Sequence, residues 1–358
     1  MPWLVWAALL YAIIAGPDAR DPHSLVQPPV RVDGLRNPDI SGLILGVYRP
    51  WLRYTFQFEM SRTGGEGGSR IKDALLEVRP SPTTRVAFGQ FKVPFGLQQL
   101  TSSGRQQFVD RAITDSKFNP ARDIGVMAGA TVRDRTIGFE GGLFNGSGEA
   151  ARQANRSHLW AGRVFFNPLG AYTLAEGATD AGGEPVLHLG AAIRGGEAIR
   201  GRTAVGIVDD ADNQLAYNVE VAFKAPRFYS TAEHFWMRDE QTNPVPGPDL
   251  DSRGYHVQAG YLVAVPATEI GIRYAEVRGN TAADDAAVRE IRGVVGHYLA
   301  GHNLKVQADV GPADPGVLAA DDVLVGAAGA LAVLAQLGEL ELGHAPARAG
   351  GALRLPRR

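Results

Sequence analysis

The most regular feature of the chain is an alternation of hydrophobic and polar residues along extended segments. In residues 52–60 every second residue is apolar, and the apolar set is Leu52, Tyr54, Phe56, Phe58 and Met60. Residues 214–224 and 304–310 repeat this pattern. Successive side chains of a β-strand point to opposite faces, so a period of two predicts strands with one apolar face and one wet face.

The same pattern occurs along most of the chain. Most matching segments have nine to eleven residues, close to the roughly 9–11 residues that a tilted transmembrane strand needs. Fourteen segments are predicted as strands: 40–48, 52–60, 71–79, 85–93, 122–132, 136–145, 157–166, 186–193, 214–224, 227–237, 254–263, 268–277, 288–299 and 304–311.

The connections between these segments alternate in length. Short ones include Arg49–Trp51, Pro80–Thr84 and Ala300–Asn303, and long ones lie near 61–70, 94–121, 146–156, 194–213, 238–253 and 278–287. Short turns at one end and long loops at the other are typical of an outer-membrane barrel. The connection from Asn167 to Pro185 breaks the rule, because it is long where a short turn is due.

Parity predicts one further strand at each end, which gives a transmembrane antiparallel β-barrel of about sixteen strands. We divide the chain into a leader or atypical N-terminal segment (1–39), the barrel (40–311) and an atypical C-terminal segment (312–358) with room for the closing strand. Trp3–Ala15 is an apolar run with two open interpretations, a secretory signal core or a buried leader. By propensity, Gly329–Leu342 favours helix over strand.

Composition agrees with a β protein and excludes several other classes. Glycine makes up 44 of 358 residues, above the roughly 7 % of average usage, which favours many tight turns. The absence of cysteine excludes a disulfide scaffold, a thiolate metal site and a cysteine nucleophile. A net charge of −2 does not point to nucleic acid. We also find no HExxH, Walker or Gly-x-Ser-x-Gly motif, and we predict neither an enzyme nor a cofactor or metal site.

Aromatic residues lie near the ends of the predicted strands, where a membrane barrel carries interfacial girdles. We assign to these girdles Tyr48, Trp51, Phe166, Phe223, Phe228, Phe235, Trp236 and Tyr298. The alternative is that these rings form the core of a soluble β-sandwich.

Several motifs resemble those of the phosphate-selective porins, the porin O and P family. They are Gly89–Gly96, Arg122–Val126, Phe144–Gly148, Asn167–Gly170, Tyr255–Tyr261, Arg289–Arg292 and Asn303–Val310. This resemblance covers roughly residues 40–311 and preserves the order of the motifs. It implies a sixteen-stranded barrel, usually trimeric, that passes anions and in some members phosphate or polyphosphate. It also implies that the long loop after residue 92 folds inward and narrows the pore.

The charges of that loop favour anions. From residue 92 to 122 there are five basic residues and two acids, Asp110 and Asp115, a net charge of +3. A narrow passage lined by positive charge concentrates anions, and arginine offers planar donors that suit phosphate oxygens. The alternative is an ordinary solvated surface loop. The candidate constriction residues are Lys92, Arg105, Arg111, Lys117 and Arg122.

The strands carry further charges on their polar faces. The basic ones are Arg53, Arg163, Lys224, Arg273 and Lys305, and the acidic ones Glu59, Glu140, Glu220, Glu269 and Asp309. Because this wall is mixed in charge, selectivity is expected to come from the loop.

The sequence therefore predicts an outer-membrane porin that gives small anions passive diffusion, embedded in lipid and assembled as a homotrimer. The alternative is a soluble all-β ligand-binding protein, similar to a carbohydrate-binding sandwich. A continuous apolar band on the outside distinguishes the porin, because a sandwich buries its apolar faces against each other.

Overall fold

A computed structural model describes residues 30–31, 40–49, 51–61, 68–149, 158–179, 183–199, 211–240, 248–264, 268–282, 287–311 and 332–335. Its strands are β1 (Val30–Arg31), β2 (Ile40–Arg49), β3 (Leu52–Ser61), β4 (Gly68–Ser81), β5 (Thr84–Lys92), β6 (Arg122–Val132), β7 (Ile137–Phe144), β8 (Leu159–Phe166), β9 (Val186–Ile199), β10 (Ala211–Ala225), β11 (Phe228–Glu240), β12 (Leu250–Ala264), β13 (Thr268–Arg278), β14 (Ala287–Tyr298), β15 (Leu304–Val310) and β16 (Ala332–Ala335). Among these residues, no helix is long and apolar enough to cross a membrane.

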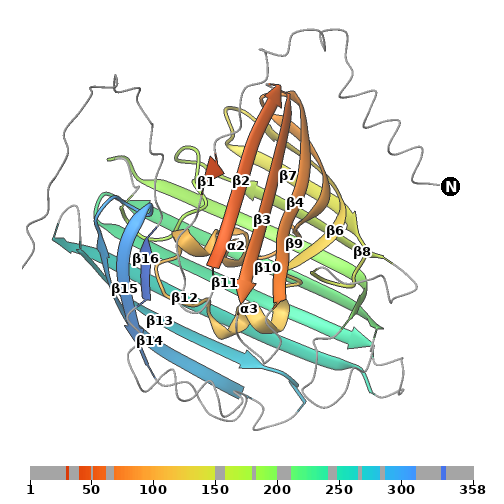
Figure 1. Cartoon of the computed structure of the whole chain (residues 1–358). Helices are drawn as coiled ribbons and strands as arrows, with labels where there is room; N and C mark the ends of the chain where they lie inside the picture. Colours follow the sequence, from red (N-terminus) through yellow and green to blue (C-terminus); the bar gives the residue numbers. More distant parts are fainter. Residues whose placement is uncertain are drawn as a thin grey trace, which may run out of the picture.

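The strands form one antiparallel sheet in which each strand pairs with the next along the chain (Figure 1). The fourteen predicted segments correspond one by one to β2–β15. The prediction of an all-β antiparallel fold is therefore confirmed. The regular up-and-down order follows from the alternating connections, because a short turn leaves the next strand beside the previous one.

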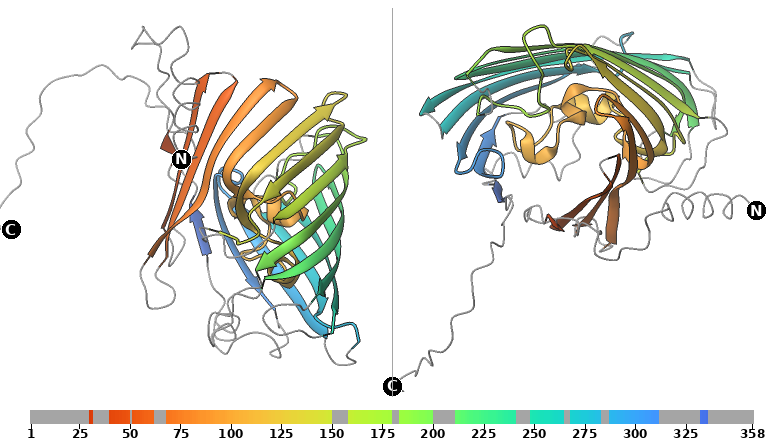
Figure 2. Two further views of the ribbon diagram at one scale, coloured as in Figure 1. Left: turned by 90° about the vertical axis from the view of Figure 1, so that its right-hand side faces the viewer. Right: turned by 90° about the horizontal axis from the view of Figure 1, so that it is seen from above.

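The prediction of a closed barrel with about sixteen spanning strands is not met by the described residues. Thirteen strands have eight residues or more, while β1 has two, β15 seven and β16 four. In this part of the chain no ladder joins β1 to β16, so the sheet is an open arc (Figure 2). Parity required strands beyond both ends, but the sequence there lacks the alternation that sustains a long strand. The run Trp3–Ala15 lies outside the described residues.

The C-terminal expectation needs a second correction. Ala332–Ala335, within the run whose composition favours helix, forms β16 and pairs with β15. Backbone pairing with the neighbouring strand outweighs the weak helix preference of alanine and leucine.

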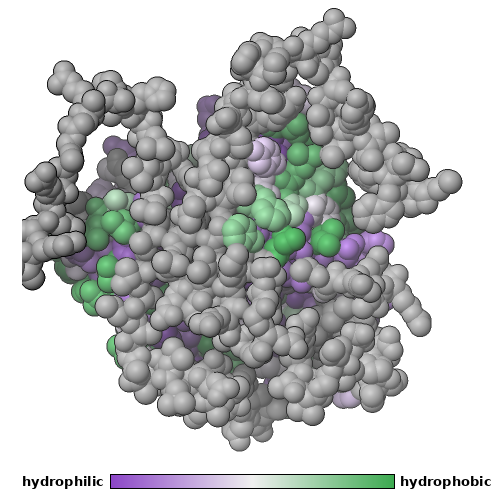
Figure 3. Space-filling model, in the orientation of Figure 1, coloured by the Kyte–Doolittle hydropathy of each residue, from purple (hydrophilic) through white to green (hydrophobic). Residues whose placement is uncertain are grey.

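Burial follows the predicted alternation. In β10, Gln214, Ala216, Asn218 and Glu220 are buried on the concave side of the sheet, called the lumen here. Their neighbour Val219 is 53 % exposed on the outside. Such outward apolar residues recur from strand to strand. In the orientation of Figure 1, hydrophobic and hydrophilic areas lie side by side (Figure 3). Exposed apolar side chains along the convex face suit lipid, whereas a soluble sandwich would bury them.

The girdle assignment is correct for part of the aromatic set. Trp51, Phe166 and Phe228 are exposed on the outside. Phe235 and Tyr298 were assigned wrongly, because both are buried in the lumen. Phe235 shares its face with the lumen residue Glu233, so the parity of the strand, and not nearness to its end, decides where the ring points.

Two stretches of chain occupy the concave side of the sheet. Residues 93–121, called the inward segment, contain α2 (Leu97–Leu100), a 3-10 turn (Ser103–Arg105) and α3 (Ile113–Phe118). Seen from above, both helices lie inside the curve of the sheet (Figure 2). Residues 167–179, called the turn segment, follow β8 and come to the same interior, where Ala175, Glu176 and Ala178 are buried.

A charge placed on the convex face should destabilise the barrel according to its depth. Val219 lies in the middle of β10, and we expect Val219→Arg to cost about 2–4 kcal/mol of folding free energy. Val263, 46 % exposed near the end of β12, is the matched control, and Val263→Arg should cost about 0–1 kcal/mol. Urea-dependent folding into lipid vesicles measures both. Equal losses at the two positions would contradict the lipid-facing assignment.

Candidate constriction site

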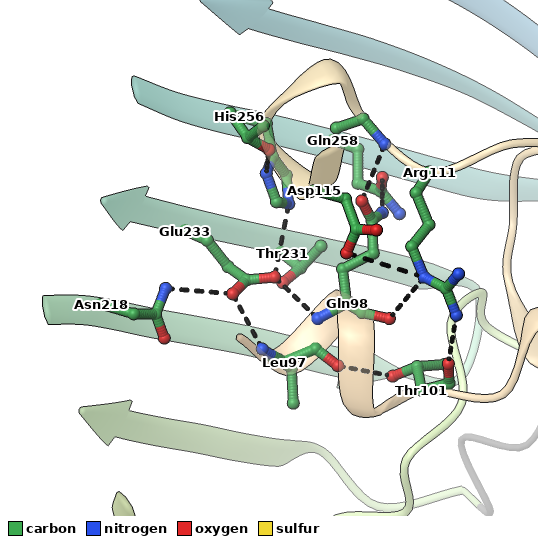
Figure 4. A network of polar contacts seen from close by, with 12 residues as sticks. Leu97, Gln98, Thr101, Arg111, Asp115, Asn218, Thr231, Glu233, His256 and Gln258 are labelled. Atoms are coloured by element: carbon green, nitrogen blue, oxygen red, sulfur yellow. Dashed lines mark hydrogen bonds and ion pairs between the residues drawn. The ribbon is translucent and has the colours of Figure 1, made fainter. Parts of the chain in front are cut away.

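The inward segment is attached to the lumen wall at the start of α2. Glu233 of β11 accepts hydrogen bonds from the backbone N–H groups of Leu97 at 2.8 Å and Gln98 at 2.7 Å. Asn218 of β10 donates to the same carboxylate at 3.1 Å (Figure 4). The first N–H groups of a helix lack partners within the helix. Glu233 therefore serves as the N-terminal cap of α2 from a strand far away in the sequence.

Gly96 makes this geometry possible. It precedes α2 with φ +77 and offers no capping side chain of its own. A Cβ at this position would lie 2.4 Å from Asn119 Oδ1, so a larger residue would be strained and would collide with the end of α3. The glycine thus lets the chain turn sharply and leaves the cap to Glu233.

Two predicted site residues meet at the other end of α2. Lys92 Nζ lies 3.0 Å from the Thr101 carbonyl oxygen and 3.3 Å from that of Leu100. Arg111 donates to the carbonyl oxygens of Thr101 at 3.1 Å and Gln98 at 3.3 Å. The last carbonyls of a helix lack partners within the helix and attract cations. Lys92 and Arg111 therefore stabilise the fold of the segment.

Arg111 also faces an acid of its own segment. Asp115 of α3 lies 3.8 Å from the Arg111 guanidinium. Burial raises the pKa of the Asp115 carboxyl, and the nearby Arg111 charge opposes this shift. Part of the positive charge counted in the sequence is therefore offset within the segment.

Aromatic packing seals α3 against the wall. The rings of Phe118 and Phe235 stack at 5.2 Å between centroids, and Phe95 contacts Phe235 at 6.1 Å. All three side chains are fully buried. These contacts give the segment a small apolar core inside an otherwise polar lumen.

Three basic side chains of the wall donate to the backbone of the inward segment. Arg273 reaches the Asp110 carbonyl oxygen at 2.8 Å and Arg194 that of Phe118 at 2.9 Å. Lys305 bonds the carbonyl oxygen of Gln106. Arg273 also pairs with Glu290 at 2.6 Å. These buried cations satisfy carbonyl groups that have left the sheet and would otherwise lack partners.

The remaining wall cations are placed as follows. Arg163 is buried and pairs with Glu220, its Nε lying 2.9 Å from the carboxylate. Lys224 is buried, with Nζ 5.0 Å above the Tyr172 ring of the turn segment. Arg53 is exposed on β3. The charge of Arg163 is thus balanced within the wall, and Lys224 lies against an aromatic ring.

The other constriction candidates differ in environment. Arg122 of β6 is paired with Asp73 of β4 at 2.8 and 3.2 Å. Lys117 lies in the last turn of α3 and is half-buried. Arg105 is exposed at the end of the 3-10 turn, and its guanidinium has no hydrogen-bond or ion-pair partner among the described residues. The structure therefore separates Arg105 from the cations that are held in place by partners.

Sequence reasoning missed the acceptors and amides that hold the segment. Glu233 falls on a predicted polar face, but nothing nearby in the sequence indicates its partners. Gln98 bonds Glu176 and Gln258, each through its side-chain nitrogen, at 3.0 and 3.2 Å. The unusual length of the connection from Asn167 to Pro185 was the one signal for Glu176.

The aromatic seal predicts a protease test. Phe118→Ala removes core packing worth about 3–5 kcal/mol, and we expect the inward segment to loosen while the wall stays folded. Trypsin should then cleave the folded protein after Arg105, Arg111 or Lys117, as identified by mass spectrometry. Phe139→Ala, which changes an outward ring that is 48 % exposed, should leave these sites protected. If both variants resist trypsin equally, the seal does not hold the segment.

Comparisons with known proteins agree with this architecture. A family model described as phosphate-selective porin O and P matches residues 40–311. A comparison with curated proteins found no match.

The solved structures that are similar to this chain include Pseudomonas putida OprB. It has 10 % identity and a TM-score of 0.50, and the match covers 76 % of this chain and 81 % of that one. Vibrio cholerae OmpT in its trimer form has 11 % identity and a TM-score of 0.48, covering 86 % of this chain and 92 % of that one. At 10 % identity the likeness to OprB shows the fold alone. Because the family model spans more than half of the sequence and the strands carry an apolar outer face, the chain belongs to the phosphate-selective porin O and P family and is a bacterial outer-membrane porin.

Proposed function

We propose that this porin favours small anions, with phosphate or polyphosphate as the solute class, and that Arg105 is the main residue that meets them. The observation that carries the proposal is the exposed Arg105 guanidinium without a partner among the described residues. A cation without a counter-ion acts on a passing solute with its full field.

The pairing of other lumen cations with acids supports the assignment of Arg105. Arg122 is neutralised by Asp73, Arg163 by Glu220 and Arg273 by Glu290. An ion pair has a field that falls off faster than that of a single charge, so these pairs attract solutes weakly. Arginine also presents a planar fork of N–H donors that suits the oxygens of phosphate.

His302 lies in the turn at 299–303, within electrostatic reach of Arg105. Burial and the charges of Lys305 and Lys224 lower the pKa of His302 to about 3, and Arg105 contributes in the same direction. Because burial is the largest cause of this shift, His302 is neutral and leaves the charge of Arg105 without competition from a second cation in this turn.

The proposal also covers the cofactors, partners and oligomeric state of the pore. Passive diffusion needs no cofactor and no catalytic residue, and nothing in the charge of the chain calls for a nucleic-acid partner. We further propose a homotrimer in outer-membrane lipid, which the family resemblance implies.

Reversing the charge of Arg105 should weaken the preference for anions. We expect Arg105→Glu to lower the ratio of anion to cation permeability by about threefold or more, because the charge acts where screening by bulk salt is least. Single-channel reversal potentials across a salt gradient measure this ratio in planar bilayers.

Arg133→Glu is the matched control. Arg133 is exposed in the turn between β6 and β7 and lies outside the inward segment, so the same change of charge there should leave the reversal potential nearly unchanged. A wild-type reversal potential for Arg105→Glu would show that Arg105 does not face the solute.

A further inference from the structure

The two segments inside the lumen enter it from opposite ends. The inward segment connects β5 to β6, and the turn segment lies between β8 and β9. In an up-and-down sheet, connections that follow odd and even strands lie at opposite ends. The turn segment therefore reaches the interior from the short-turn end, where the other connections are brief, and meets the inward segment there.

Glu176 makes the contact between them. Its carboxylate accepts hydrogen bonds from the Gln107 backbone N–H at 2.8 Å, Gln98 Nε2 at 3.0 Å and Gln258 Nε2 at 2.9 Å. Its own backbone N–H donates to the Arg105 carbonyl oxygen at 2.7 Å. The side chain is 2 % exposed. A buried carboxylate that accepts several N–H bonds holds its donors firmly, since losing any of them leaves a buried polar group unpaired.

These bonds hold the chain directly after the Cα of Arg105. One is to the carbonyl of Arg105 itself and another to the N–H two residues later. Before it, the Arg105 N–H donates to the Ser102 carbonyl oxygen at 2.8 Å. The Arg105 backbone is therefore fixed before and after its Cα, and Glu176 supplies the contacts after it, so the direction of the side chain depends on Glu176. Gly260 of β12 leaves the room that this arrangement needs, because a Cβ there would lie 1.7 Å from Gln107 Nε2.

The turn segment is itself fixed to the wall, so it can act as a rigid support. The Ala178 N–H donates to Glu269 at 3.1 Å, and Tyr298 donates its hydroxyl to the same carboxylate at 2.7 Å. At the start of the segment Asn167 Oδ1 lies 2.7 Å from His188 Nδ1. Side chains of the sheet thereby fix the position of the turn segment at both of its ends.

We propose that Glu176 is a positioning residue for anion selectivity, and that the turn segment is a second element of the constriction that holds Arg105 toward the solute. This inference rests on the proposed role of Arg105. It assigns to the unusually long connection after β8 a function that a simple turn would not need.

The test is a double-mutant cycle between Glu176→Asp and Arg105→Gln, read as single-channel reversal potentials. Glu176→Asp keeps the negative charge but withdraws the carboxylate by one methylene from its three donors. We expect it to lower the anion-to-cation permeability ratio by about twofold or more, and to have no further effect when Arg105 is already glutamine. Glu184→Asp is the matched control, since Glu184 is exposed at the far end of the same connection.

A second measurement covers the case in which Glu176→Asp assembles poorly. The chain contains no cysteine, so Arg105→Cys provides a single thiol whose reaction rate with a charged thiosulfonate reports its access to the pore. Adding Glu176→Gln, which keeps the size of the side chain, should change that rate by about threefold or more.

The outcomes separate the inference from the proposed function. If Arg105→Gln shifts the reversal potential but Glu176→Asp does not, Glu176 does not position Arg105 and the inference is wrong. An effect of Glu176→Asp that is equally large with and without Arg105 also overturns it, because the residue would then act by itself. If Arg105→Gln has no effect, the proposed function fails first. An unchanged thiol reaction rate likewise counts against the inference.

Discussion

The structure depends on one constraint, which is that a chain leaving the sheet must find new partners for its backbone. The inward segment has little regular secondary structure, and much of it is buried in the lumen. Unpaired backbone groups inside a protein are costly, so side chains of the wall must replace the lost ladder. Glu233 and Glu176 accept from N–H groups, while Lys92, Arg194, Arg273 and Lys305 donate to carbonyl oxygens.

This requirement changes the meaning of the charges in the lumen. A basic residue on the polar face of a strand suggests a surface for anions, but most of the wall cations here bind backbone carbonyls or pair with acids. Burial of a charge without such partners would be prohibitive, so the structural use of these residues follows from their depth. Among the constriction candidates, Arg105 is the exposed residue left for the solute, because its backbone and not its side chain is bound.

The meeting of two segments from opposite ends gives the interior its rigidity. Either segment alone would be a loop held at the two strands that it connects and by the side chains of the wall. Where they join, Gln98, Gln107 and Gln258 share the Glu176 carboxylate, and Phe118 stacks on Phe235 close by in the same lumen. Small residues on β12 make this approach possible, as Gly260 shows.

The sequence by itself determined the strands, their order and the face that each residue occupies, because these follow from a period of two and from the length of connections. Residues such as Val219 and Glu220 were thereby assigned correctly to outside and inside. Tertiary structure alone decided which lumen charges neutralise one another. Glu233 and Leu97 are 136 positions apart, and Lys305 and Gln106 are 199 apart, so no local pattern could relate them. Partners in space depend on how the sheet curves and on which segments enter it, and neither is encoded in a neighbourhood of the chain.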